Sequence, residues 1–241
     1  MARHSHFHNI QLTKGKADAQ RAKTFTKFAK NIVVAAKDGG GDPSFNFKLR
    51  VAIDLAKSVN MPKENIERAI ARGVGGGEGE NIEEIIYEGF APGGVAILVQ
   101  CLTDNRNRTV AEVKNVVAKA GGTIGVGGSV MWMFEKKGVI NLVDVSVIKD
   151  RDVFEMSMIE AGAEDIVLID NGLQIICEVK DLKKVLDAVE SFGLKSDAAG
   201  IEYLAKTTTK VEAQEVEKQI EDLIARLEEN DDVDAVFTNE E

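Results

Sequence analysis

The chain has 241 residues, 44% of them hydrophobic and 29% charged, which is typical of a globular protein with two or three domains. Its longest charge-free runs, 89–103 and 120–134, have fifteen residues each and contain glycine, which excludes a membrane-spanning helix; the basic N-terminus lacks the apolar segment of a secretory signal. Both cysteines lie in apolar runs, which favours buried free thiols in a reducing compartment. We therefore expect a cytoplasmic protein with no membrane partner.

Charge is unevenly distributed along the chain. The net charge is −10 overall, but residues 1–72 carry fourteen Lys or Arg against six Asp or Glu, a net charge of +8, and the rest carries −18. Such asymmetry indicates a basic module that meets a polyanion, joined to an acidic body. Local drift in composition is the alternative.

The basic part of the sequence predicts three helices. In residues 16–37 the apolar side chains recur three or four positions apart, and the lysines cluster on the opposite arc. Because like charges on one face repel each other, this lysine stripe is best explained by phosphates that neutralise it. Further helices are predicted for 45–59 and 61–73, before a glycine-rich linker. The candidate nucleic-acid-binding residues are Arg3, His4, His6, His8, Lys14, Lys16, Arg21, Lys23, Lys27, Lys30 and Lys37.

The three histidines at positions 4, 6 and 8 raise the alternative of a metal site. Structural zinc normally takes four ligands, and no further cluster of Cys or His completes such a set. A phosphate bound among Arg3, Lys14 and Lys16 would instead favour the protonated form of these histidines. We therefore predict a basic arm, and neither a metal nor a cofactor.

Beyond residue 80, strand patterns alternate with helix patterns. Residues 135–205 have the pattern of a self-contained βαββαβ series. The segment before this series predicts, in order, strand 85–90, a turn, strand 95–102, helix 108–122 and strand 129–135. That series has helices at 148–161 and 182–192, and after it come strand 207–211, helix 214–228 and strand 233–238. If this series is left out, the segments on its two sides together contain a second βαββαβ pattern.

The predicted fold class is therefore α+β. An N-terminal three-helix domain, residues 1–80, is followed by two ferredoxin-like α/β domains, one inserted into the other. The inserted domain comprises residues 135–205, and the split domain comprises 81–134 and 206–241.

The sequence shows no catalytic constellation. No histidine follows position 8, so a Cys or Ser nucleophile in the body would lack an imidazole base. The glycine-rich segment 121–128 precedes a strand instead of opening a helix, which is the wrong context for a dinucleotide site. We expect no enzyme. Arg106 and Arg108, in the segment 103–109, form a basic spot that is either a secondary nucleic-acid contact or part of a salt-bridge network.

Five segments of the chain are similar to the YebC family of bacterial proteins, whose mitochondrial relative is a translational activator for a cytochrome oxidase subunit. They are residues 4–27, 35–54, 60–73, 87–109 and 127–138, in the same order and spread over essentially the whole chain. The resemblance implies a helical domain plus two α/β domains, no catalysis, and a cytoplasmic regulator that faces nucleic acid.

The expected function is a non-enzymatic, nucleic-acid-binding regulator of gene expression, resembling YebC-type DNA-binding transcriptional regulators. The alternative is a translation factor that binds ribosomal RNA or the ribosome and relieves stalling. A lysine stripe contacts backbone phosphates, which position a protein without specifying sequence, and no convincing helix-turn-helix is present. Physical reasoning alone thus favours structured RNA. The sequence leaves the oligomeric state open, a monomer included.

Overall fold

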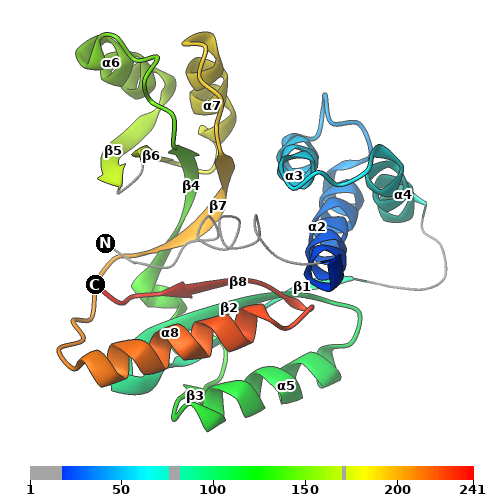
Figure 1. The fold of residues 1–241 in the computed structure, drawn as a ribbon, viewed down its shortest axis with the longest axis vertical. Coiled ribbons are helices and arrows are strands. Elements are labelled where there is room, and N and C mark those ends of the chain that lie inside the picture. The colour runs from blue at the N-terminus through cyan, green and yellow to red at the C-terminus, as the bar shows by residue number, and fades with distance from the viewer. Residues whose placement is uncertain (1–17, 76–81, 170–171) are drawn as a thin grey trace. The chain divides into compact units, whose positions relative to one another are not determined.

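The computed structural model describes residues 18–75, 82–169 and 172–241, with an α+β fold of helices followed by two four-stranded antiparallel sheets (Figure 1). The fold class predicted from the sequence is confirmed. The chain divides into two compact units, Met1–Phe134 with Ala205–Glu241, and Glu135–Leu204. None of the helices in the described ranges combines the length and apolar character that crossing a bilayer requires.

Helices α2 (Asp18–Gly39), α3 (Phe47–Ser58) and α4 (Lys63–Val74) form the N-terminal region. Asn46 fixes the turn between the first two, because its buried side chain bonds on three sides. Its Oδ1 accepts from the Leu49 amide at 3.0 Å, and its Nδ2 donates to the carbonyls of Ala35 and Gly40, both at 2.7 Å. This is an N-cap that also ties α3 back to the end of α2.

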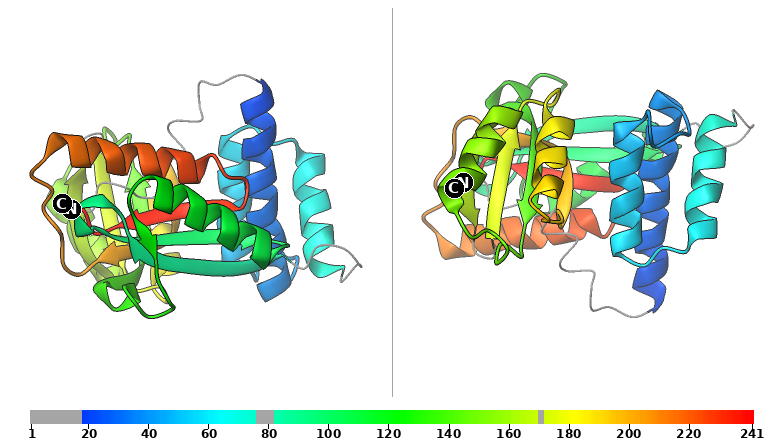
Figure 2. Two further views of the ribbon diagram at one scale, coloured as in Figure 1. Left: turned by 90° about the horizontal axis from the view of Figure 1, so that it is seen from below. Right: turned by 90° about the horizontal axis from the view of Figure 1, so that it is seen from above.

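The first sheet contains β1 (Glu83–Phe90), β2 (Ala96–Thr103), β3 (Thr123–Ile124) and β8 (Val233–Thr238), in the order β3-β1-β2-β8. Helices α5 (Arg106–Lys119) and α8 (Gln214–Glu228) lie side by side on one face of it (Figure 2). The core between helices and sheet includes Val99 and Cys101 from the sheet, Val117 from α5, and Ile220 and Leu227 from α8, all fully buried. We call this four-stranded sheet the split sheet, because β8 is separated from its other strands in the sequence by the second unit.

The second unit contains β4 (Phe134–Leu142), α6 (Arg151–Ala161), β5 (Ala163–Ile169), β6 (Gly172–Cys177), α7 (Leu182–Ser191) and β7 (Ala198–Ala205). Its strand order, β5-β6-β4-β7, and its βαββαβ connection give the predicted ferredoxin-like arrangement. The rings of Phe154 on α6 and Phe192 after α7 meet edge to face at 5.3 Å in its core.

Two predicted strands are wrong. Residues 207–211 form only an isolated bridge, between Thr209 and Glu240, so the split sheet connects as ββαβ followed by αβ and not as βαββαβ. Residues 129–135 contain a 3₁₀ turn, η2 (Met131–Met133), before β4 begins. The cause is the buried Glu88, whose carboxylate accepts the amides of Gly128, Val130 and Met131 at 2.6–2.9 Å and so removes them from strand pairing.

Candidate nucleic-acid interface

Helix α2 carries the predicted lysine stripe, and the structure divides the stripe in two. Lys23 and Lys37 are exposed, whereas Lys27 and Lys30 are partly buried. The five consecutive residues 32–36 are all buried, which requires cover on more than one side of the helix, because a single packed face buries positions three or four apart. Lys27 and Lys30 are therefore less accessible to a phosphate than Lys23 and Lys37, and their predicted contact with nucleic acid stays a prediction.

The partly buried side of α2 contacts the acidic segment between α8 and β8. Lys27 Nζ donates to the Glu228 carbonyl, and Lys30 Nζ donates to the Asp231 carbonyl at 2.9 Å. The next residue, Asn31, donates from Nδ2 to Asp234 Oδ1 at 2.6 Å. Burial lowers the pKa of Lys27, although the surrounding carboxylates oppose this shift. These contacts position α2 on the split sheet.

Asp232 is the centre of this contact. Its side chain is 5% exposed; Oδ1 lies 2.6 Å from Lys30 Nζ, and Oδ2 accepts from Arg108 and from Thr109 Oγ1, both at 2.8 Å. Burial alone would raise the pKa of Asp232, but the hydrogen bonds from Lys30, Arg108 and Thr109 outweigh it and lower the pKa to about 2. The carboxylate therefore stays ionised and joins α2, α5 and the α8–β8 segment.

The two arginines of segment 103–109 differ in their surroundings. Arg108 pairs with Asp104 and with Asp232, each at 2.8 Å, so its contacts are those of the salt-bridge network that the sequence left as one option. The Arg106 side chain is exposed, while its backbone carbonyl accepts the Tyr87 hydroxyl at 3.4 Å. Asn105 caps α5 by accepting the Arg108 amide.

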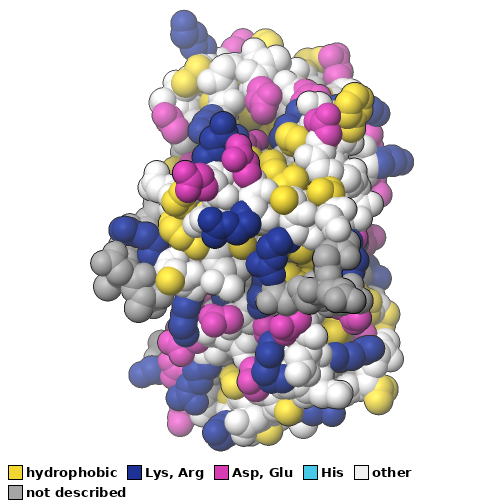
Figure 3. Space-filling view, turned by 90° about the vertical axis from the view of Figure 1, so that its right-hand side faces the viewer, with side chains coloured by type: hydrophobic (Ala, Val, Ile, Leu, Met, Phe, Trp, Pro, Cys, Tyr) yellow, Lys and Arg dark blue, Asp and Glu magenta, His cyan; other side chains and the backbone are white. Residues whose placement is uncertain are grey.

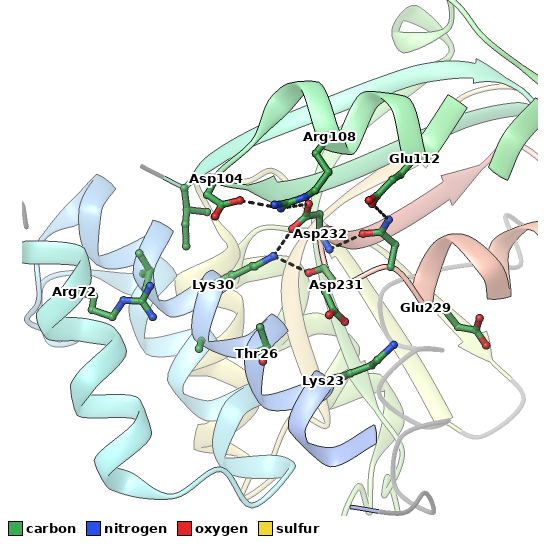
Figure 4. A pocket seen from close by; sticks show the side chains of 14 residues that line it. Lys23, Thr26, Lys30, Arg72, Asp104, Arg108, Glu112, Glu229, Asp231 and Asp232 are labelled. Carbon is green, nitrogen blue, oxygen red and sulfur yellow. Dashed lines mark hydrogen bonds and ion pairs between the residues drawn. The ribbon is translucent and has the colours of Figure 1, made fainter. Parts of the chain in front are cut away.

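A groove of about 610 Å³ lies along this contact, between α2 and α4 on one side and the ends of β2 and α8 on the other (Figure 4). Its charged lining has both signs: the basic residues Lys23, Lys30, Arg72 and Arg108, and the acidic residues Asp104, Glu112, Glu229, Asp231 and Asp232. The acidic side chains oppose a polyanion lying deep in the groove. Of the two lysines of α2 that line the groove, Lys23 is exposed and Lys30 is partly buried.

The surface around the helical region also mixes charges. On the side where α4 lies, Lys and Arg side chains are interspersed with Asp and Glu instead of forming one continuous basic patch (Figure 3). Among the residues that the structure describes, no group of three or more His, Cys, Asp or Glu side chains is placed to hold a metal ion. The described side chains of this surface are joined by ion pairs and hydrogen bonds.

Six of the predicted contact residues lie outside the described part of the chain, as does the candidate metal pattern at positions 4, 6 and 8: Arg3, His4, His6, His8, Lys14 and Lys16. Arg21, like Lys23, is exposed on α2.

Sequence reasoning missed the two carboxylates that organise this unit. Asp232 lies in an acidic run after α8, which reads as solvated surface, and its partner Lys30 is 202 residues away in the chain. Glu88 left a signal, because it stands among apolar residues in the second half of β1, after Ile85, Ile86 and Tyr87. A buried carboxylate must find donors, and the backbone amides of Gly128, Val130 and Met131 supply them.

Family models for two regions match the chain. Residues 5–76 match the TACO1/YebC protein N-terminal domain, and residues 82–240 match the TACO1/YebC second and third domain.

Relatives and a solved structure cover almost the whole length. A "probable transcriptional regulatory protein" of Persephonella marina is 48% identical over 99% of this chain and 95% of its own. The "probable transcriptional regulatory protein YebC" of Salmonella typhimurium is 46% identical over 100% and 96%. The crystal structure of a conserved hypothetical protein from Aquifex aeolicus superposes with a TM-score of 0.86 at 43% identity, covering 95% of this chain and 93% of that one. The chain therefore belongs to the TACO1/YebC family.

Proposed function

We propose that this protein is a non-enzymatic, nucleic-acid-binding regulator of gene expression. The observation that carries the proposal is the family match along almost the whole chain, with relatives at 46–48% identity that are named as probable transcriptional regulatory proteins. DNA is the first target class to test, and structured RNA is the second. The proposed location is the cytoplasm.

The charge distribution supports this proposal. Residues 1–72 have a net charge of +8, and the sequence-independent part of nucleic-acid binding comes from Lys and Arg that neutralise phosphates. The proposed contacts on α2 are Arg21, Lys23 and Lys37, together with the basic N-terminal residues, and Arg106 is a secondary contact. Lys27 and Lys30 take a different role, since they position α2 on the split sheet.

We further propose three domains, residues 1–80, 81–134 with 206–241, and 135–205. Two observations support these boundaries. The matches to the family models change between residues 76 and 82. The compact units of the chain meet at Phe134 and Ala205.

The test is fluorescence anisotropy of the full-length protein with labelled duplex DNA and with a labelled structured RNA, over a salt series. We expect affinity to fall with salt, at a log–log slope of about −0.9 per phosphate contact on duplex DNA. Lys23→Glu should weaken binding, while Lys183→Glu, an exposed lysine on α7, should leave it unchanged. If neither nucleic acid binds in a salt-dependent manner, the proposed function is wrong.

A further inference from the structure

Helix α6 exposes three large apolar side chains. Val153, Met156 and Ile159 are 55%, 63% and 62% exposed, whereas Phe154 and Met158 on the opposite side are fully buried. At about 100° per residue, the three exposed side chains lie within an arc of about 120°. A helix that only covers its own sheet has a polar outer face. Helix α6 therefore has an apolar side that does not pack in the core of its own unit.

A fourth exposed apolar side chain lies on β5, the edge strand that follows α6. Leu168 is 64% exposed, and it pairs directly with Leu173 of β6, which is buried. Paired residues point to the same side of a sheet, so Leu168 belongs to the side on which the core lies. Only Gly162 separates α6 from β5, so helix and strand run antiparallel and the start of α6 lies level with the end of β5. Val153 and Leu168 thus lie at the same end of the α6–β5 pair.

The charged side chains within this arc of α6 have one sign. The exposed Asp152 and Glu160 fall within the same arc as the three apolar residues. The basic residue of the helix, Arg151, lies outside that arc and pairs with Glu155 at 2.5 Å. Nucleic acid would be repelled here, and a second copy of the chain would place Asp and Glu against each other. The complementary partner is apolar and bordered by Lys or Arg.

We propose that Val153, Met156, Ile159 and Leu168 form a docking surface for an amphipathic helix of a basic protein. Its apolar side covers the three α6 residues and Leu168, and its flanking lysines or arginines meet Asp152 and Glu160. The contact would be one helix packed on another, with the apolar anchors of the partner three and four positions apart. The surface shares no residue with the proposed nucleic-acid contacts on α2, so the inference does not depend on the proposed function.

The test uses the full-length protein and two labelled 18-residue peptides of leucine and lysine with the same composition. In one peptide the leucines share a helical face, and in the other they are spread around the helix. Anisotropy titrations should give at least about tenfold tighter binding for the first peptide. Met156→Gln with Ile159→Gln should remove that preference, and Asp152→Asn with Glu160→Gln should weaken binding and flatten its salt dependence. Val126→Gln, at a residue 80% exposed in the other unit, is the matched control and should change nothing.

Three results would overturn the proposal. The first is equal binding of both peptides, which would mean that charge alone acts. The second is unchanged binding by the Met156→Gln, Ile159→Gln variant, whose thermal melting should match that of the wild type because both side chains are exposed. The third is light scattering that shows a dimer which this variant abolishes, since the surface would then pair with itself.

Discussion

Lys30 Nζ lies 2.6 Å from Asp232 Oδ1, across 202 residues of sequence. The lysine is on α2 and the aspartate follows α8, and both side chains are largely withdrawn from solvent, at 17% and 5% exposed. An ion pair in such surroundings is costly to break, because removing one partner leaves the other charge buried. A lysine that the sequence assigns to phosphate binding therefore fastens the helical region to the split sheet.

Replacing Asp232 by Asn should destabilise the protein by about 2–4 kcal/mol, because Lys30 and Arg108 lose their common counter-charge. Urea unfolding at pH 7 measures the change. Asp222→Asn, an exposed aspartate on α8, is the control and should shift stability by under about 0.5 kcal/mol. A loss at Asp232 no larger than the control would mean that the ion pair contributes nothing.

The contribution of Asp232 should depend on pH. Its pKa is about 2 in the folded protein, below the value of about 3.9 for an unfolded chain. A folded-state pKa below the unfolded one stabilises the fold above the unfolded value, and this stabilisation is lost as pH falls toward the folded value. The difference in unfolding free energy between wild type and Asp232→Asn should thus be constant near neutral pH and shrink between about pH 4 and pH 2. Urea titrations of both proteins at pH 7, 5 and 3 measure this difference. A difference in unfolding free energy that is the same at all three pH values would contradict the prediction.

Two lysines about two turns apart on α2 should behave differently. Lys23→Ala should leave stability within about 0.5 kcal/mol and reduce the salt slope of nucleic-acid binding by up to about one. Lys30→Ala should lower the free energy of unfolding by about 1–3 kcal/mol, because Asp232 and the Asp231 carbonyl lose a donor. Thermal melting and the anisotropy salt series, run on both variants, separate the roles. Equal effects in both assays would contradict this division.

Glu88→Gln should loosen the segment that follows β3. The glutamine offers one acceptor oxygen where the carboxylate has two, so at least one of the amides of Gly128, Val130 and Met131 loses its partner, at about 1–3 kcal/mol. The emission of Trp132, the only tryptophan in the chain, reports on this segment, because its Nε1 donates to the Ser129 carbonyl at 3.1 Å. Emission and urea midpoint should both shift in Glu88→Gln and stay unchanged in Glu83→Gln, an exposed residue of the same strand.

Elements with their own periodic pattern could be predicted from the sequence. Helix α8 has the predicted bounds, Gln214–Glu228, because Ile220, Leu223, Ile224 and Leu227 recur at helical spacing and are all buried. The strand expected at 207–211 failed because its threonines and valine favour extended structure, but a strand also needs an edge to pair with, and only Thr209 forms a bridge. Local propensity describes the segment, whereas pairing depends on the rest of the chain.

The candidate site was less predictable than the fold. The helical wheel of α2 separates apolar from basic residues correctly, but it cannot show that a second surface packs against the basic side. Lys27 meets the Glu228 carbonyl 201 positions away, and no local pattern encodes such a contact. Arg108 is similar, since its neighbour Asp104 is visible in the sequence and its partner Asp232 is not.

The insertion of one unit into the other has a consequence for the order of folding. The Lys206 amide donates to the Met133 carbonyl at 2.9 Å, so the chain leaves the split sheet and returns to it at almost one point. The split sheet must join residues far apart, as in the Ala96 amide bonded to Asn239 Oδ1 143 positions later. Once β4 and β7 are neighbours in the inserted unit, its two ends are already together and the loop left to close is short. During synthesis β2 cannot pair with β8 until the whole inserted unit has been made. An inserted unit that has already folded by then leaves β2 and β8 a shorter loop to close before they pair.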